Sequence, residues 1–411
     1  MSHEKDRSLL RELAERYAAI AALPVQEEKR RLWRKLNALK PERPMVLIDQ
    51  VCWNEIRAEE TLILRCENAE CRVYERVLRR ALYQWAHFPA DMVVEPFIRV
   101  DKAVANSGFG LAVKERTIRL SEFSDVSSHQ FVNLIHSMED IQKIQTPVIT
   151  HDPVETQRRM GFAGWLFGGI LEIREEGVDP YLSIWDPISM WMSVEGLLYA
   201  MVDSPDLMHA LAKRVLDGYM CMLDQLEAQG LLCHHQSLIH CTGAYTDDLP
   251  AAGFEPRHPR TEDIWMMGLA QAFATVSPSM FEEYELTYSM PLFNRFGLVY
   301  YGCCDPLDGK MSQVRRIPHL RKISMSPWVN QARGAREIGP DYVFSRKPNP
   351  SYLAMDTFDD VIVKKEFRET LEVCRANGCP VEFILKDIST IRSQPERLSR
   401  WADIAMRSVT S

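Results

Sequence analysis

The chain has 411 residues, of which 46% are hydrophobic and 26% are charged, so it carries ample apolar material for a buried core and is not a disordered protein. Its 49 Lys and Arg against 57 Asp and Glu give a net charge of −8, which argues against nucleic acid as a partner. No apolar stretch approaches the roughly 20 residues of a membrane span, and the charged start lacks a signal-peptide pattern, so we expect a globular cytoplasmic protein without a membrane partner.

The first 42 residues show a helical pattern. Leu9, Leu13 and Tyr17 share one face of a helix, Pro24 interrupts the pattern, and it resumes until the polar break KPERP at residues 40–44. We therefore expect a helical N-terminal extension over residues 1–42 and one body over residues 43–411. The run PMVLIDQVCW predicts a strand entering that body, and the chain from there to about residue 150 shows no clear order of elements.

From residue 180 onward, short apolar runs alternate with longer segments of helical period. The predicted strands are Tyr181–Ile184, Leu238–Thr242, Leu298–Gly302, Lys322–Met325, Tyr342–Ser345 and Val381–Leu385. The predicted helices are Val194–Ala228, Glu262–Ala274, Pro278–Phe296, Gln331–Ile338, Phe358–Asn377 and Gln394–Met406. Such alternation is typical of parallel strands joined by crossover helices, and the repeat count favours a (β/α)₈ TIM barrel whose missing strands come from the earlier chain.

Polar side chains follow the predicted strands at the end where a barrel places its reacting groups. The candidates are Asp186, His240, Cys241, Asp247, Cys303, Cys304, Arg346, Asn349 and Lys386. Glu195 follows in the next helix, where it could bind a substrate or simply favour the helix dipole. Asp247 could equally orient a ligand or cap the next segment. Motifs of nucleotide hydrolysis and of serine hydrolases are absent from the sequence.

Two of these strand ends carry ligands that zinc favours. His240 and Cys241 end one strand, and the pair Cys303-Cys304 ends the next one. Because neighbouring residues of a strand point to opposite faces, His240 and Cys241 could share a metal only where the strand has ended or bulged. For the same reason only one of Cys303 and Cys304 should face inward. The alternatives are buried thiols beside a hydrogen-bonded core histidine, or a vicinal disulfide.

The strand ends YYGCCDPLDGKM, ISMSPW, YVFSRKPNPS and ILKDIS, in this order and spacing, resemble the uroporphyrinogen decarboxylase superfamily. More narrowly, they are similar to its branch of corrinoid-linked methyltransferases, over roughly residues 150–405. The resemblance implies a (β/α)₈ barrel whose mouth binds a tetrapyrrole or the substrate of a methyl transfer. Decarboxylases of the family carry an arginine-rich PxWxMRQAGR stretch, which RPMVLIDQVCWNEI lacks.

The methyltransferase branch holds zinc through His-x-Cys at one strand end and a cysteine at a later one. The match here would be His240, Cys241 and one of Cys303 or Cys304, with Cys304 preferred. This sequence departs from the pattern, because its histidine and cysteine are adjacent.

The leading hypothesis is therefore a barrel enzyme that moves a methyl group between a small substrate and a corrinoid (cobalamin) on a separate protein, with zinc assisting. Asp186, Asp247 and Lys386 would orient the substrate, and Glu195, Arg346 and Asn349 would bind it. The alternative is decarboxylation of a tetrapyrrole or other polycarboxylate held by Arg99, Arg333 and Arg346. A third possibility is a barrel that has lost catalysis and serves as a binding partner.

Overall fold

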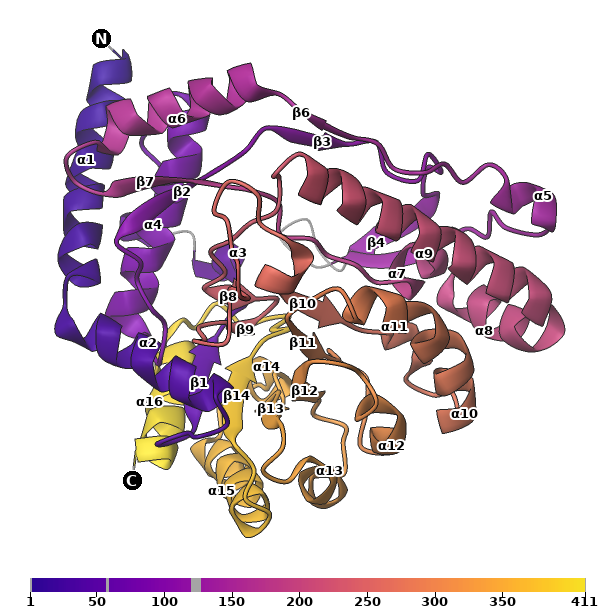
Figure 1. Ribbon diagram of the computed structural model, residues 1–411. Coiled ribbons are helices and arrows are strands. Elements are labelled where there is room, and N and C mark those ends of the chain that lie inside the picture. Colours follow the sequence, from indigo (N-terminus) through magenta and orange to yellow (C-terminus); the bar gives the residue numbers. More distant parts are fainter. Residues whose placement is uncertain (1, 57–58, 120–126, 411) are drawn as a thin grey trace.

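The computed structural model of the chain describes residues 2–56, 59–119 and 127–410. At its centre lies a six-stranded, wholly parallel sheet in the order β1-β14-β13-β12-β11-β10 (Figure 1). Its strands are β1 (Met45–Ile48), β10 (Trp265–Gly268), β11 (Leu298–Tyr301), β12 (Leu320–Met325), β13 (Val343–Arg346) and β14 (Val381–Leu385). Because β1 pairs with β14, the first and last strands of this sheet end side by side.

Four smaller strand pairs accompany the sheet. One pair, β2 (Phe97–Asp101) with β7 (Glu172–Glu176), is parallel. The antiparallel pairs are β3 (Val104–Asn106) with β6 (Ile149–His151), β4 (Glu115–Arg119) with β5 (Ser127–Phe131), and β8 (Leu238–Ile239) with β9 (Thr242–Gly243). The fold is thus mixed α/β, and the ladders within the described residues do not close the six strands into a ring.

Helices surround the sheet and extend from it (Figure 1). The N-terminal half contains α1 (Ser2–Ala21), α2 (Pro24–Asn37), α3 (Trp53–Ile56), α4 (Ala69–His87), α5 (Met138–Ile141), α6 (Pro153–Phe167), α7 (Trp185–Met192), α8 (Val194–Asp203) and α9 (Pro205–Ala228). The C-terminal half contains α10 (Pro278–Met280), α11 (Thr287–Phe293), α12 (Met311–Val314), α13 (Gln331–Ile338), α14 (Ser351–Ala354), α15 (Asp360–Ala376) and α16 (Glu396–Thr410). Of the helices in the described ranges, none has the length and apolar character needed to cross a bilayer.

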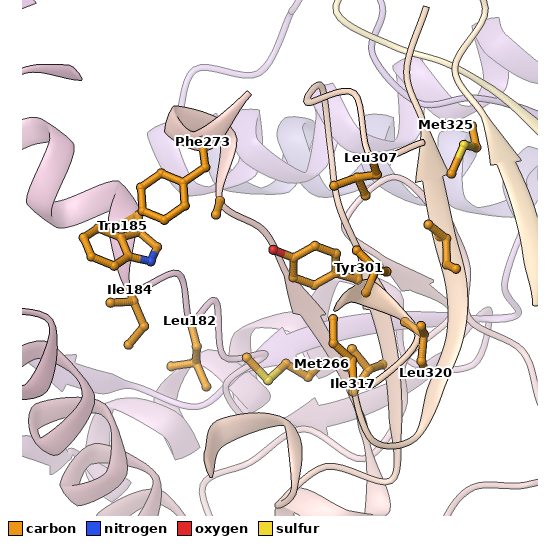
Figure 2. Packing of buried hydrophobic residues seen from close by; sticks show 14 of the residues in the cluster. Leu182, Ile184, Trp185, Met266, Phe273, Tyr301, Leu307, Ile317, Leu320 and Met325 are labelled. Atoms are coloured by element: carbon orange, nitrogen blue, oxygen red, sulfur yellow. The ribbon is translucent and has the colours of Figure 1, made fainter. Parts of the chain in front are cut away.

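The central sheet buries both of its faces, because alternate side chains of each strand point to opposite sides. We call the two faces outer and inner. On the outer face, Met266 and Tyr301 pack with Leu182 and Trp185 in the largest hydrophobic cluster (Figure 2). On the inner face, a second cluster includes Met45, Leu47, Trp265, Met267, Leu298, Tyr300, Val343 and Ile384. The inner cluster is where the side chains of the strand ends converge.

The inner face also buries a charged pair. Lys322 Nζ lies 2.7 Å from Glu382 Oε2, and neither side chain is exposed. The hydroxyls of Thr242 and Ser345 donate to the two oxygens of Glu382 at 2.8 and 2.6 Å. These bonds satisfy the carboxylate and tie the β8–β9 hairpin to β12, β13 and β14.

The N-terminal residues are helical, as predicted, and they pack against the body. Trp33 Nε1 of α2 donates to the Asp91 carbonyl at 3.0 Å, and Asn37 Nδ2 donates to the Gly243 carbonyl at 3.0 Å. A Cβ atom at Gly243 would lie 2.5 Å from Trp33 Cδ2, so a glycine is required where the hairpin meets the indole ring. The helix α2 thus covers one end of the inner cluster, and a domain boundary at residue 43 stays a prediction.

Four of the six predicted strands after residue 180, at β11 to β14, match the structure to within two residues at each end. The strand predicted at Tyr181–Ile184 is wrong: this segment is irregular and leads into α7, where Ser183 Oγ accepts from the Asp186 amide at 3.2 Å. The helix predicted over Glu262–Ala274 is also wrong, since its centre is β10. All four residues of β10 are buried, so the run shows no alternation that would identify a strand.

Candidate functional site

Three segments that are far apart in the chain meet at Cys303. Its Sγ atom lies 3.5 Å from His240 Nε2, in the turn between β8 and β9. It also accepts a hydrogen bond of 2.8 Å from Lys386 Nζ, just after β14, and Lys386 Nζ lies 3.2 Å from His240 Nε2. The loop after β11, the loop after β14 and the hairpin turn thus supply a thiol, an ammonium and an imidazole to one point.

Cys304 and Asp387 extend this arrangement toward the surface. The two sulfur atoms of Cys303 and Cys304 are 3.5 Å apart, and the Cys304 thiol donates to Asp387 Oδ2 at 3.0 Å. We refer to Cys303, Cys304, His240, Lys386 and Asp387 together as the Cys303 centre. The single proton of the Cys304 thiol can be donated either to Asp387 Oδ2 or to Cys303 Sγ, and Lys386 donates to Cys303 Sγ.

The backbone of the Cys303 centre is strained at two positions. His240 has φ of 53° and Asp387 has φ of 57°, in the left-handed region that side chains other than glycine seldom adopt. Such conformations persist only where the surrounding structure imposes them, and they gather at functional sites. At His240 the strain comes from the tight turn that ends β8 and directs the imidazole toward Cys303.

The same turn gives the side chain of Cys241 contacts that differ from those of His240, although Cys241 and Cys303 belong to the same inner cluster. Cys241 is 1% exposed, packs in the inner cluster, and has its sulfur 3.8 Å from the Tyr300 hydroxyl. Burial raises the pKa of its thiol to about 11, so it stays protonated at neutral pH. The predicted strand Leu238–Thr242 is interrupted by this turn, which is the condition for His240 and Cys241 to bind one metal ion. The two side chains nevertheless contact different residues, Cys303 for His240 and Tyr300 for Cys241.

Electrostatics favour a thiolate at Cys303. The hydrogen bond from Cys304 lowers the pKa of Cys303, and His240 and the Lys386 ammonium lower it further against the effect of burial. Burial lowers the pKa of Lys386, but the neighbouring thiol groups and Asp387 outweigh it and raise the pKa overall. At neutral pH the centre therefore contains a thiolate–ammonium pair, the form in which a cysteine is reactive.

A cavity of ≈ 300 Å³ opens beside the Cys303 centre, and we call it the mouth cavity. It lies at the carboxyl ends of β11, β12, β13 and β14. Its polar lining residues are Cys303, Cys304, Lys347, Asn349, Ser351, Lys386, Asp387 and Ser389, and its apolar ones are Pro327, Trp328, Pro348, Pro350 and Ala354. A second cavity of ≈ 380 Å³ has His240, Arg99 and Tyr181 in its wall. A small substrate in the mouth cavity would contact the thiolate and the ammonium directly.

The structure brings some of the predicted site residues together and places others apart. His240, Cys303, Cys304 and Lys386 form the centre, and Asn349 lines the mouth cavity. Asp186 accepts a 2.7 Å hydrogen bond from the hydroxyl of Tyr181, which lines the second cavity.

Three other predicted residues, Arg346, Glu195 and Asp247, lie outside the Cys303 centre and do not line either cavity. Arg346 is buried on the outer face, where it bonds Glu366 Oε1 at 2.9 Å and supports the loop after β13. Glu195 is exposed in the first turn of α8. The side chain of Asp247 is 85% exposed and lies 3.5 Å from Arg34 Nε. Arg346 thus points to the opposite face of β13 from the site, and Glu195 and Asp247 lie at the protein surface.

Three further residues lie near the site. Lys347 and Asp387 stand among the polar strand-end residues of the sequence but were assigned no role, and Asp49, which follows β1, was not singled out. Burial raises the pKa of Asp49, while His240 and Lys386 act to lower it. Alternation along β13 places Ser345 and Lys347 on the inner face, so the signal for Lys347 was present in the strand period.

The arrangement does not fit the zinc ion that the resemblance implies. Within residues 2–56, 59–119 and 127–410, no group of three or more His, Cys, Asp or Glu is placed to hold a metal. The 3.5 Å separation of His240 Nε2 and Cys303 Sγ suits two ligands of one ion with bonds of roughly 2.0–2.3 Å. However, Lys386 Nζ contacts both atoms and fills the place between them. The zinc ion implied by the resemblance is thus untested, and the positions of these side chains do not support it.

Comparisons with known proteins give little further guidance. No family model matches the chain, and no curated protein matches it. Among solved structures, a methyltransferase from Methanosarcina mazei is similar over 92% of this chain and 97% of its own, with 10% sequence identity and a TM-score of 0.48. Similarity at this level leaves the function to be argued from the residues of the site.

Proposed function

We propose that this chain is an enzyme that transfers a methyl group between a small substrate in the mouth cavity and a corrinoid carried by a separate protein. The observation that carries the proposal is the convergence of His240, Cys303 and Lys386 beside a cavity at the carboxyl ends of parallel strands. The strand-end motifs, which resemble corrinoid-linked methyltransferases, support it. We further propose that the six-stranded sheet is the larger part of a (β/α)₈ barrel.

Loss of a methyl group leaves an electron pair on the sulfur, oxygen or nitrogen atom that carried it. A reduced corrinoid supplies the nucleophile that accepts the methyl group. In this proposal Lys386, which lines the mouth cavity, donates a hydrogen bond to the substrate heteroatom, and its ammonium stabilises the negative charge that develops there as the bond to the methyl carbon breaks. Cys303 and His240 hold Lys386 in position. Lys386 thereby performs the charge stabilisation that zinc performs in other methyl-transfer sites.

The apolar part of the mouth cavity would exclude water from the reacting groups. Water would screen the ammonium of Lys386 and weaken its effect on the developing charge. Exposed loop residues, among them Trp328, surround the entrance, where the corrinoid face would approach. The side chains of the Cys303 centre thus act on the substrate, and the loops act on the carrier.

Decarboxylation, the alternative function, requires arginines that are free to hold a polycarboxylate, and the three candidate arginines are already paired. Arg99 is paired with Asp101, Arg333 with Asp308 and Arg346 with Glu366. None of the three lines the mouth cavity as described. A substrate with several carboxylates would have to break these pairs in order to bind.

The test is to mix the purified protein with methylcobalamin and to follow the cobalt absorbance with a panel of acceptors that includes thiols and reduced pterins. The reverse direction uses reduced cobalamin with methoxy and methylthio compounds. We expect a change in absorbance that depends on the protein with at least one member of the panel. No change with any member, in either direction, would contradict the proposal. Elemental analysis of the same preparation measures zinc, which the arrangement around Lys386 predicts to be well below one ion per chain.

A further inference from the structure

The side chain of Lys347 is a buried cation in the wall of the mouth cavity. The residue is 3% exposed and follows β13 on the inner face of the sheet. Its Nζ donates to Ser345 Oγ at 2.6 Å and lies 3.4 Å from the Ser345 carbonyl oxygen. It also lies 5.1 Å from the centre of the Tyr300 ring. These partners are uncharged.

The other buried cations near it have their own anions. Lys322 pairs with Glu382 at 2.7 Å, and Lys386 pairs with the Cys303 sulfur at 2.8 Å. Glu382 and Asp49 attract Lys347 without bonding to it directly, and the hydroxyl of Ser345, which donates to Glu382 Oε1 at 2.6 Å, stands between Lys347 and Glu382. In the part of the chain that the structure describes, no carboxylate lies within 4.0 Å of Lys347 Nζ.

A buried charge without an anion in direct contact is costly, and proteins normally pair it or neutralise it. Lys347 lines a cavity, so a bound molecule can supply a negative charge in contact with its ammonium. A hydrogen bond between an ammonium and an anion is shorter and roughly twice as strong as one between neutral groups. Lys347 thus has the properties of an anion-binding group.

The mouth cavity also has an apolar part of its wall. Pro327, Pro348, Pro350 and Ala354 line it, together with Trp328, which is 71% exposed. An indole ring this exposed leaves apolar surface in contact with water, and a flat or apolar ligand would cover it. The volume of ≈ 300 Å³ is at the lower end of the range for small-molecule sites.

We propose that the mouth cavity binds a small carboxylate with an apolar body, whose anionic group pairs with Lys347 and whose body packs against Trp328 and the neighbouring prolines. This inference rests on the proposed function, since it names the substrate class of the same site. The methyl-bearing atom of such a substrate would face Lys386. The two buried ammonium groups then have separate tasks: Lys347 recognises the substrate, and Lys386 acts where the methyl group leaves.

The proposal is tested by calorimetric titration with three probes. Benzoate has both features, benzamide has the same shape without the charge, and acetate has the charge without the apolar body. We expect benzoate to bind most tightly. Replacement of Lys347 by methionine should weaken benzoate binding roughly ten- to hundredfold, as loss of a charged hydrogen bond implies, and should leave benzamide unaffected. Trp328→Ala should weaken benzoate and benzamide alike.

A matched control is Lys365→Met, on the exposed side of α15, which should change nothing. Thermal melting of Lys347→Met verifies that the variant folds. Equal binding of benzoate and benzamide, unchanged benzoate binding by Lys347→Met, or no benzoate binding by the wild-type protein would each overturn the proposal. The titration needs no corrinoid. Carboxylate binding without methyl transfer would therefore contradict only the proposed function, and methyl transfer without carboxylate selectivity would contradict only this inference.

Discussion

Replacing Lys386 by methionine tests how Cys303 is held as a thiolate. Methionine has a similar length and no charge, so the variant removes the ammonium that donates to Cys303 Sγ at 2.8 Å and fills most of its space. The hydrogen bond from Cys304 and the contact with His240 remain. The pKa of Cys303 should therefore rise but should not return to that of a free thiol.

The size of the effect follows from the contact distance. Two unit charges 2.8 Å apart attract by about 6 kcal/mol at an effective dielectric constant near 20, which is an upper limit because Cys303 borders a cavity. Mutational data on hydrogen bonds to charged groups give about 1.5–3 kcal/mol. Since each 1.4 kcal/mol is a factor of ten, the thiolate fraction at a pH below the new pKa should fall roughly ten- to hundredfold.

The assay is the rate of alkylation by iodoacetamide as a function of pH, with peptides quantified by mass spectrometry. The rate follows the thiolate fraction, because the thiolate is the reactive form. The centre lowers the pKa of Cys303 to about 3, so the pH at which the rate is half its plateau should lie in the acid range in the wild type and should rise by roughly one to two pH units in Lys386→Met. Cys221 in α9, which is partly buried, serves as an internal reference in the same sample. Profiles with the same midpoint, with Cys221 unchanged, would refute the electrostatic explanation of the thiolate.

Two further predictions concern buried charges. Lys322→Met should lower the free energy of unfolding by about 3–5 kcal/mol in urea titrations, because it leaves Glu382 buried without its cation. A double variant that also carries Glu382→Gln should recover part of this loss. If the double variant recovers none of it, the explanation is contradicted. Burial raises the pKa of Glu285 to about 8, so the folded protein binds a proton that the unfolded chain releases above its ordinary pKa. Stability from this group is present at low pH and is lost as the pH rises toward 8, by at most about 1.4 kcal/mol per pH unit. Glu285→Gln should flatten the dependence of the melting temperature on pH between about 5 and 8, and an unchanged slope would contradict it.

The sequence predicted most of the C-terminal sheet because its strands are short apolar runs between polar turns. The strands β11 to β14 and the helix α13 were identified in this way. The strand β10 was missed, since four buried residues carry no alternation and the flanking residues fit a helix. The hairpin of β8 and β9 was predicted as one strand, and only its contacts reveal the turn at His240.

The candidate site was predictable to the extent that strand ends meet at one edge of a parallel sheet. The position at a strand end is sufficient to identify His240, Cys303 and Lys386 as candidates. The different surroundings of Cys241 depend on the turn, which the sequence does not reveal. Lys347 is an anion-binding candidate because no carboxylate bonds its ammonium directly. The sequence does not reveal this, because it depends on Ser345 lying between Lys347 and Glu382 in the folded chain.

The most direct test of the central claim compares single-turnover methyl transfer by Cys303→Ser and Cys221→Ser, each with methylcobalamin and the best acceptor of the wild-type protein. Serine at position 303 cannot form the anion that pairs with Lys386, whereas position 221 lies in α9, outside the residues that line the mouth cavity. We expect Cys303→Ser to lose at least about tenfold in rate, which is the lower end of the effect of losing a hydrogen bond to a charged group. Cys221→Ser should have the rate of the wild type. Equal rates for the two variants would contradict it.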